Sequence, residues 1–335
     1  MKYLLSLTLL FISLFSFYSC GDDTVSNSAN NPPEFDIYLV KRDYQNNLIS
    51  TYTIKSDGTD LKLFNDSMGV SSNSYRNKIL LTKGYYNFND IYIANYNGSF
   101  MTKIPLGSYQ IIYCNLSPDA EKFYFTTSMW ELFILNVDGS GLVPITNQQT
   151  NSFNPVKFSP DGKMIAYLEP SSFNHRAVKL FISNTTGSYK KLLKDSIQDG
   201  DFVDWSNDGK KIIYHYVPLG MNVAKIGAID TSLNNFLILA EGIFPSCSTV
   251  SGKICFIKNA GSLRDLFLMD QDGSNIINIS NTPNASEYNV KWSKEGMRIL
   301  YNTYEGSYPP KLWMYDLNTN SNTLLADSVS DAIWQ

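Results

Sequence analysis

The feature that most constrains the fold of this chain is an internal sequence repeat. Three segments share an apolar strand, a turn rich in Ser, Asp and Gly, and a second apolar strand: VKFSPDGKMIAY (156–167), VDWSNDGKKIIY (203–214) and VKWSKEGMRILY (290–301). Two weaker copies are CNLSPDAEKFYF (114–125) and SCSTVSGKICFI (246–257). In an alignment of Leu116, Phe158, Trp205, Ser248 and Trp292, successive copies are 42, 47, 43 and 44 residues apart. This period is typical of the blades of a β-propeller.

Each repeat continues with two more strands. Segments of alternating character end in Asn-Gly or Asp-Gly, as in DIYIANYNGS (90–99), ELFILNVDGS (131–140) and DLFLMDQDGS (265–274). These dipeptides supply the positive φ angles of tight hairpins. A short fourth strand follows, as in GLVPITN (141–147) and NIINISN (275–281). The pattern predicts an all-β chain of four-stranded antiparallel units, and no stretch with helical periodicity competes with it.

The two ends of the repeat region complement each other. DIYLVKR (36–42), TYTIKSDGTD (51–60) and LKLFND (61–66) read as a second, third and fourth strand with no first strand before them. DAIWQ (331–335) places Trp334 42 residues after Trp292, at a first-strand position with nothing after it. We therefore expect the C-terminal strand to pair with the N-terminal blade and close the ring. The 301 residues from Phe35 to Gln335 divide into seven repeats of 43, which predicts one seven-bladed propeller over 35–335.

These segments resemble the TolB-type propeller repeat, whose consensus runs approximately W-SPDGK-IAF and then IYVMNADGS-LT. The resemblance covers nearly all of the chain after the N-terminal leader. It implies the propeller fold and leaves the function open, because propellers include binding proteins, peptidase-associated modules and lyases.

The N-terminus predicts export and lipid anchoring. Residues 1–19 combine Lys2 with the apolar run LLSLTLLFISLF (4–15), the pattern of a signal peptide. FYSC (17–20) resembles the lipobox of bacterial lipoproteins, which implies cleavage before Cys20 and acylation of that residue. The stretch from 20 to 34 has the composition of a flexible linker. We expect a protein tethered to the bacterial outer membrane, periplasmic or surface-exposed.

Composition disfavours several function classes. The formal net charge is −4 and no basic run is present, so a nucleic-acid partner is not expected. Pectic lyases resemble this fold but use several histidines around a metal, whereas this chain has only His175 and His215. DQDGS (270–274) lacks the spacing of an EF-hand loop. The sequence predicts no metal site and no cofactor, and it contains no G-x-S-x-G motif for a catalytic serine.

Aromatic loop residues define a candidate ligand-binding face. In a propeller, the loops from second to third strands lie on the same rim as the connections between blades. Candidate ligand-binding residues in the second-to-third loops are Tyr44, Tyr85, Tyr86, Phe88, Trp130, Phe173, His175, Tyr304 and Tyr308. Such rings can stack on sugars or anchor peptides, although they can equally pack on their own blades.

Two functional hypotheses remain. The first is a lipid-anchored, non-catalytic propeller that binds a glycan, a peptide or an envelope protein through its loop face. The alternative is a carbohydrate-active hydrolase or lyase with a carboxylate site in the central channel.

Cys247 and Cys255 flank the turn VSG (250–252) and could form a disulfide across that hairpin in an oxidising compartment. The alternative is that both remain free thiols.

Overall fold

The computed structural model describes residues 36–43, 46, 48–71, 75–84, 88–146, 156–170, 177–198, 202–232, 235–280, 282, 284–306 and 309–335. The chain divides into two units, Met1–Pro33 and Glu34–Gln335, and all of the described residues belong to the second. The predicted signal peptide (1–19), the linker (20–34) and Cys20 lie outside the described residues.

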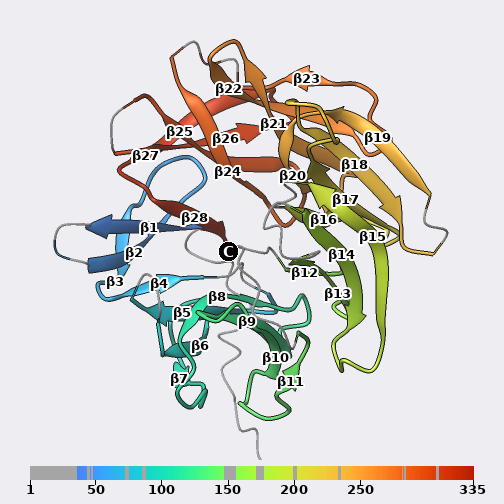
Figure 1. The fold of residues 1–335 in the computed structure, drawn as a ribbon. Coiled ribbons are helices and arrows are strands. Elements are labelled where there is room, and N and C mark those ends of the chain that lie inside the picture. Colours follow the sequence, from blue (N-terminus) through green and yellow to red (C-terminus); the bar gives the residue numbers. More distant parts are fainter. Residues whose placement is uncertain are drawn as a thin grey trace, which may run out of the picture. The chain divides into compact units, whose positions relative to one another are not determined.

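The described residues form seven four-stranded antiparallel sheets arranged as blades around a central axis (Figure 1). Blades are numbered along the chain, and their strands are given from the innermost outwards. Blade 1 contains β28 (Asp331–Trp334), β1 (Ile37–Asp43), β2 (Leu48–Ile54) and β3 (Lys62–Asn65). Blade 2 contains β4 (Met68–Val70), β5 (Lys78–Lys83), β6 (Ile91–Asn95) and β7 (Thr102–Lys103). Blade 3 contains β8 (Ile111–Leu116), β9 (Lys122–Thr127), β10 (Leu132–Asn136) and β11 (Val143–Pro144).

The remaining four blades follow the same order. Blade 4 contains β12 (Lys157–Phe158), β13 (Met164–Pro170), β14 (Ala177–Asn184) and β15 (Lys190–Gln198). Blade 5 contains β16 (Val203–Trp205), β17 (Lys211–Tyr216), β18 (Lys225–Asp230) and β19 (Phe236–Glu241). Blade 6 contains β20 (Ile243–Cys247), β21 (Lys253–Ala260), β22 (Leu263–Asp270) and β23 (Ile277–Asn278). Blade 7 contains β24 (Ser286–Trp292), β25 (Arg298–Tyr304), β26 (Lys311–Asp316) and β27 (Ser321–Asp327). The predicted seven-bladed propeller is confirmed.

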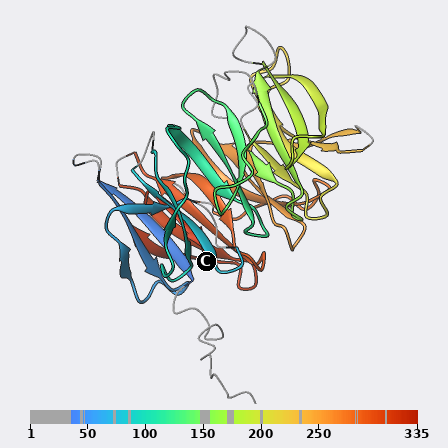
Figure 2. The same cartoon turned by 90° about the horizontal axis from the view of Figure 1, so that it is seen from below.

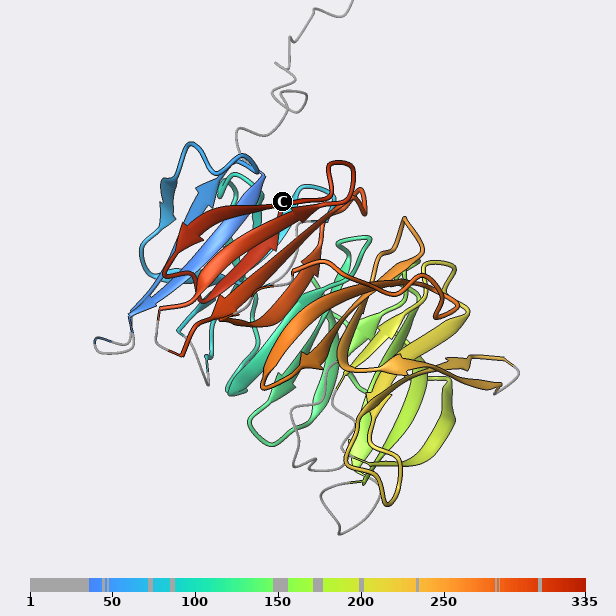
Figure 3. The same ribbon diagram turned by 90° about the horizontal axis from the view of Figure 1, so that it is seen from above.

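The C-terminal strand closes the ring, as predicted. β28 pairs antiparallel with β1, with Trp334 opposite Ile37 and Asp331 opposite Val40. Figure 3 shows this red strand beside the blue strand from the other end of the propeller unit. Trp334 is only 5% exposed, so the last residues of the chain belong to the core of blade 1.

The first-to-second turns show why the Ser-Pro-Asp-Gly sequence recurs. In blade 4, the Ser159 hydroxyl donates to Asp161 Oδ1 at 2.6 Å and accepts from the Met164 N–H at 2.9 Å. Gly162 adopts a φ of 72°, which strains residues that have a Cβ atom. Ser206 makes the same two bonds in blade 5. The repeated turn sequence therefore encodes a repeated hydrogen-bonded turn.

Neighbouring blades lie face to face (Figure 2), and buried apolar side chains cover both faces of blade 1. Along β1, Ile37 and Leu39 pack in a cluster with residues of blade 7. Tyr38, between them, packs with residues of blade 2 on the other side. Because successive side chains of a strand point to opposite faces, a strand between two neighbours must be apolar throughout. This explains the uninterrupted hydrophobic runs in the second strands.

Blade 6 requires a correction of one residue in the predicted alignment. Ser248 and Ser206 both donate their backbone N–H, at 2.9 Å, to the carbonyl of the residue five positions later. Ser248 therefore matches the turn serine Ser206, and Cys247 matches Trp205. The error arose because the turn of blade 6 lacks the Asp that marks this position in blades 3, 4 and 5.

Candidate functional site

A channel along the axis of the ring contains two adjoining cavities. One, of about 210 Å³, lies towards the first-to-second turns. The other, of about 410 Å³, lies towards the opposite end, where the blades are connected to one another; we call this the loop end. Both cavities are lined by Lys157, Ser246, Val290 and Lys291, so they form one continuous channel. The second has the size of typical ligand sites.

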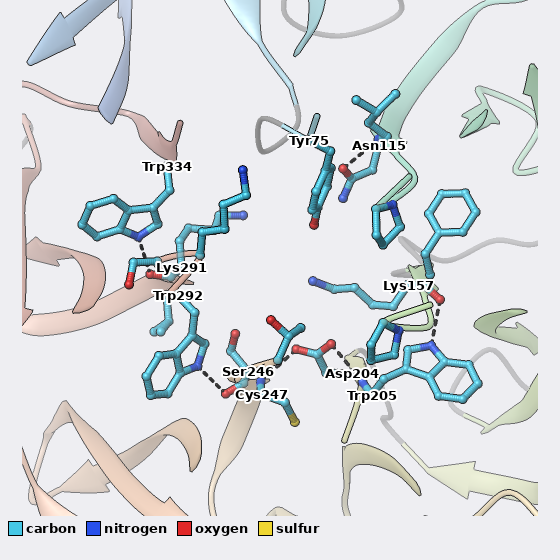
Figure 4. Close-up of a pocket in the computed structure, with 18 of the residues that line it drawn as sticks. Tyr75, Asn115, Lys157, Asp204, Trp205, Ser246, Cys247, Lys291, Trp292 and Trp334 are labelled. Atoms are coloured by element: carbon cyan, nitrogen blue, oxygen red, sulfur yellow. Dashed lines mark hydrogen bonds between the residues drawn. The ribbon is translucent and has the colours of Figure 1, made fainter. Parts of the chain in front are cut away.

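Three tryptophans of the innermost strands form part of the channel wall. Each indole Nε1 donates to a backbone carbonyl of the preceding blade: Trp205 to Lys157 at 3.0 Å, Trp292 to Ser246 at 2.9 Å and Trp334 to Lys291 at 3.1 Å (Figure 4). These bonds join adjacent innermost strands that share no β-ladder. They fix the spacing of the wall and leave the side chains of Lys157 and Lys291 pointing into the opening (Figure 4).

Cationic side chains outnumber carboxylates among the described residues that line the channel. The cations are Arg42, Lys157, Lys291 and Lys294, and the carboxylates are Asp204 and Asp331. Lys157 lies near Asp204, whose negative charge raises the pKa of the Lys157 ammonium above its ordinary value. Lys291 makes no ion pair with any residue in the described part of the chain.

The two carboxylates are held by structural hydrogen bonds. Asp204 accepts from the Trp205 N–H through Oδ1 and from the Cys247 N–H through Oδ2, both at 2.9 Å. It thereby joins blade 5 to blade 6. Asp331 accepts from the Ala332 N–H and from the Asn289 side-chain amide through Oδ1, both at 2.8 Å, and so joins blade 1 to blade 7.

Aromatic side chains line the loop end of the channel: Tyr113, Phe202, Phe244 and Tyr288. Tyr113 is 44% exposed and Phe202 is 39% exposed. The rings of Phe202 and Phe244 lie edge to face with centroids 4.6 Å apart. The buried His215 imidazole packs against both rings and accepts the Phe244 N–H through Nδ1 at 3.4 Å. Burial lowers the pKa of His215 to about 4, so its imidazole is neutral at pH 7.

The channel aromatics were missed in the sequence analysis. Phe202 and Phe244 lie immediately before or within the innermost strands, at the connections between blades, whereas the prediction considered only second-to-third loops. The sequence did contain a signal for them, namely an aromatic residue just before a copy of the repeat. Phe202 directly precedes VDWSNDGKKIIY (203–214), and Phe244 stands shortly before SCSTVSGKICFI (246–257).

The predicted ligand-binding residues have different outcomes. Phe88 is buried in a core cluster with residues of blades 2 and 3, so the prediction that its ring faces a ligand was wrong. Its backbone bridges to Ile111, which draws the loop into the core. Trp130 is half-buried and Tyr304 is 37% exposed, and neither lines the two cavities. Outside the described residues lie Tyr44, Tyr85, Tyr86, Phe173, His175 and Tyr308.

The predicted disulfide is not formed. Cys247 and Cys255 are both buried free thiols. Cys255 lies opposite Ser246, while Cys247 lies opposite Ile254, so the two thiols are displaced by one residue and point to opposite faces of the sheet. Cys247 packs between blades 5 and 6, and Cys255 between blades 6 and 7.

No group of three or more His, Cys, Asp or Glu side chains suitable for a metal ion occurs within the described part of the chain. Over the same residues, no helix has the length and apolar character needed to cross a membrane.

Solved structures share this architecture. TolB from Acinetobacter baumannii superimposes with a TM-score of 0.58 at 17% identity, covering 90% of this chain and 66% of TolB. A putative TolB from Agrobacterium tumefaciens gives 0.53 at 18% identity, covering 71% of this chain and 88% of that one. The fold is that of a TolB-like β-propeller. No protein-family model and no curated protein matches the sequence.

The TolB-like ring is also similar to part of larger enzymes. A puromycin-hydrolyzing peptidase from Mycobacterium tuberculosis gives a TM-score of 0.68 at 10% identity, over 90% of this chain. This chain spans just under two thirds of A. baumannii TolB and about half of the peptidase. At these identities the likeness concerns the fold alone.

Proposed function

We propose that this TolB-like propeller is a non-catalytic binding protein of the bacterial cell envelope, which holds a segment of a partner protein in its central channel. The observation that carries the proposal is the continuous channel itself. All seven blades contribute to its lining, its loop end carries aromatic side chains, and Lys157 and Lys291 line both of its cavities. Concave sites that combine apolar walls with a few fixed polar groups are typical of ligand binding.

The state of the channel carboxylates favours binding over the alternative of a hydrolase or lyase. Acid and base catalysts need oxygens that can exchange protons with a substrate. Both oxygens of Asp204 accept backbone N–H groups, and Asp331 is fixed by Ala332 and Asn289. The two residues belong to different blades and are already used to join neighbouring blades. Their arrangement is explained by the architecture of the ring.

The proposed location rests on the N-terminal sequence. The signal-like run in residues 1–19 and the lipobox-like FYSC junction support export and acylation of Cys20. Replacement C20A should abolish incorporation of radiolabelled palmitate and move the protein from the membrane fraction to the soluble envelope fraction. Unchanged labelling of the C20A protein would exclude Cys20 as the acylated residue.

A plugged channel tests the binding proposal. Ser246 lines both cavities, so S246W places an indole in the channel, whereas S262W places the same residue at the exposed β21–β22 turn. Envelope proteins cross-linked to each purified variant would be quantified by mass spectrometry. We expect S246W, folded by circular dichroism, to lose the partners that wild type and S262W retain. Equal capture by all three proteins would refute a channel site.

The loop face is proposed as a secondary contact. Trp130 and Tyr304 are the described members of the predicted aromatic set that remain accessible to solvent. The W130A and Y304A variants should weaken partner capture less than S246W does. Peptide and glycan arrays with these variants would identify which class of ligand the rim contacts.

A further inference from the structure

The charge of the channel differs in sign from the charge of the chain. Among the described residues, the lining carries four cationic and two carboxylate side chains, an excess of two positive charges. The whole chain has a formal net charge of −4. Gln335 also lines the turn end, and a terminal carboxylate there would reduce the excess to one without reversing it. An enclosed charge of one sign raises the local concentration of ligands of the other sign.

The two lysines inside the channel have different surroundings. Lys157 has the carboxylate of Asp204 nearby, which stabilises its charged form. Lys291 has no carboxylate within ion-pair distance in the part of the chain that the structure describes, although its side chain is half-buried. A charge in a partly desolvated site is costly unless it is paired. Lys291 is therefore the group that an incoming anion would neutralise.

We infer that the channel binds an acidic, extended peptide segment whose Asp or Glu carboxylates pair with Lys291 and Lys157. The inference rests on the proposed function and adds the chemistry of the ligand.

Hydrogen-bonding capacity favours a peptide over an acidic glycan. A sugar needs many side-chain donors and acceptors for its hydroxyl groups. In this channel the Asn289 amide nitrogen already donates to Asn302 and Asp331, and both oxygens of Asp204 are occupied. The nearby tryptophan N–H groups are also used between blades. The ammonium groups of Lys157 and Lys291 supply charged donors to a ligand, and they select for carboxylates.

The aromatic loop end suits the same ligand. Tyr113 and Phe202 are partly exposed at the larger cavity, which Lys157 and Lys291 also line. An acidic segment with flanking apolar residues would bury those residues on the rings while its carboxylates reach the lysines.

Fluorescein-labelled hexaglutamate is a direct probe of this inference. Its binding to the propeller would be followed by fluorescence anisotropy at 50 mM and 300 mM NaCl, beside labelled hexalysine and an oligogalacturonate. We expect hexaglutamate to bind, with at least a tenfold loss at the higher salt, and hexalysine not to bind. Tighter binding of the oligogalacturonate than of hexaglutamate would overturn the choice of a peptide.

Charge removal provides the residue-specific test. K291Q should weaken hexaglutamate binding by roughly tenfold, less than the loss of a fully buried charge contact, because Lys291 is half-buried. K62Q removes the same charge from the outer strand of blade 1 and should change binding by less than twofold. K157Q leaves Asp204 without its neighbouring cation, so K291Q, which breaks no ion pair, is the decisive variant. Equal affinities for wild type, K291Q and K62Q would overturn the inference.

The two proposals can fail separately. If S246W loses its partners while K291Q retains them fully, the channel binds a partner but does not select for acidic residues. If S246W retains all partners and hexaglutamate does not bind, the proposed function itself is wrong.

Discussion

The indole Nε1 of Trp334 donates a hydrogen bond to the carbonyl oxygen of Lys291, 3.1 Å away (Figure 4). This contact joins the last strand of the chain to the innermost strand of blade 7. The last strand, β28, also pairs with β1, so it connects blade 7 to blade 1 where the ring closes. The lysine whose carbonyl receives this bond also presents its ammonium group to the channel. Ring closure and the shape of the candidate site therefore depend on the same backbone.

Deletion of residues 331–335 should open blade 1. The deletion removes the buried side chains of Ile333 and Trp334, each of which stabilises the fold by about 1.5–3 kcal/mol. It also removes the β28–β1 ladder. This loss is a large part of a typical stability of about 5–15 kcal/mol. Thermal unfolding followed by circular dichroism should show a markedly lower and broader transition. A truncated chain that melts like the full-length protein would disprove closure by the C-terminus.

The W334F variant isolates the hydrogen bond to Lys291. It keeps an aromatic ring in the core but leaves the carbonyl without its indole donor, at a cost of about 1–3 kcal/mol. W205F, which removes the equivalent bond to Lys157, is the matched control within the chain and should cost a similar amount. Urea unfolding of the three proteins would compare them. If W334F is as stable as wild type while W205F is destabilised, the bond at the closure contributes nothing.

Asp204 should contribute to stability through its acceptor oxygens. D204A removes the acceptor for the Cys247 N–H and the carboxylate beside Lys157, so we expect a loss of about 2–4 kcal/mol in the free energy of unfolding. D204N keeps one oxygen acceptor and should lose less. Chemical denaturation measures both values. Equal destabilisation by the two variants would show that the charge, and not the hydrogen bonding, is what matters.

Glu287 should make stability depend on pH between about 4.5 and 7. Glu287 is 1% exposed, Thr282 donates to Oε1, and Oε2 has no hydrogen-bond partner among the residues that the structure describes. Burial, with a smaller contribution from Asp265, raises the pKa of Glu287 from 4.5 to about 7. Because the folded state holds this proton more tightly than the unfolded state does, the stabilisation is complete below pH 4.5. It is lost as the pH rises through 7, by on the order of 2–3 kcal/mol.

The E287Q variant tests this linkage. Its free energy of unfolding should fall less than that of wild type from pH 5 to pH 8, because the amide does not ionise. His215 acts in the opposite direction, since burial lowers its pKa to about 4 and its contribution is lost below that pH. It is present in both proteins and cancels in the comparison. Parallel pH profiles for E287Q and wild type would rule out Glu287 as the titrating group.

Thiol counting should confirm the reduced state of the core cysteines. The structure contains Cys114, Cys247 and Cys255 as buried free thiols. Burial raises the pKa of the Cys114 thiol to about 12, which suppresses its reactivity in the folded protein. We expect three reactive thiols per Cys20-acylated chain after denaturation and few before it. One thiol after denaturation would mean that Cys247 and Cys255 are bridged after all.

The repeat and its closure could be predicted because their signals are local and periodic. Ser159, Asp161 and Gly162 specify a turn within one short segment, and Trp334 follows Trp292 at the spacing of the repeat. Where the local signal weakens, at Cys247, the prediction slipped by one residue. The disulfide with Cys255 was predicted because the two cysteines flank the VSG turn, but the observed register places them one residue apart, on opposite faces of the sheet.

The sequence by itself determined the fold class, the number of blades and the strand that closes the ring, because turn chemistry and alternating strands act over a few residues and recur. Only the tertiary structure decided which side chains share the channel. Lys157, Asp204 and Lys291 occupy equivalent positions of the repeat but come from three blades, and with Arg42 of a fourth blade they meet only when the ring closes. The tertiary structure also decided which aromatic side chains are buried. Phe88 has the sequence surroundings of an exposed loop aromatic, yet it lies in the core because its backbone bridges to Ile111.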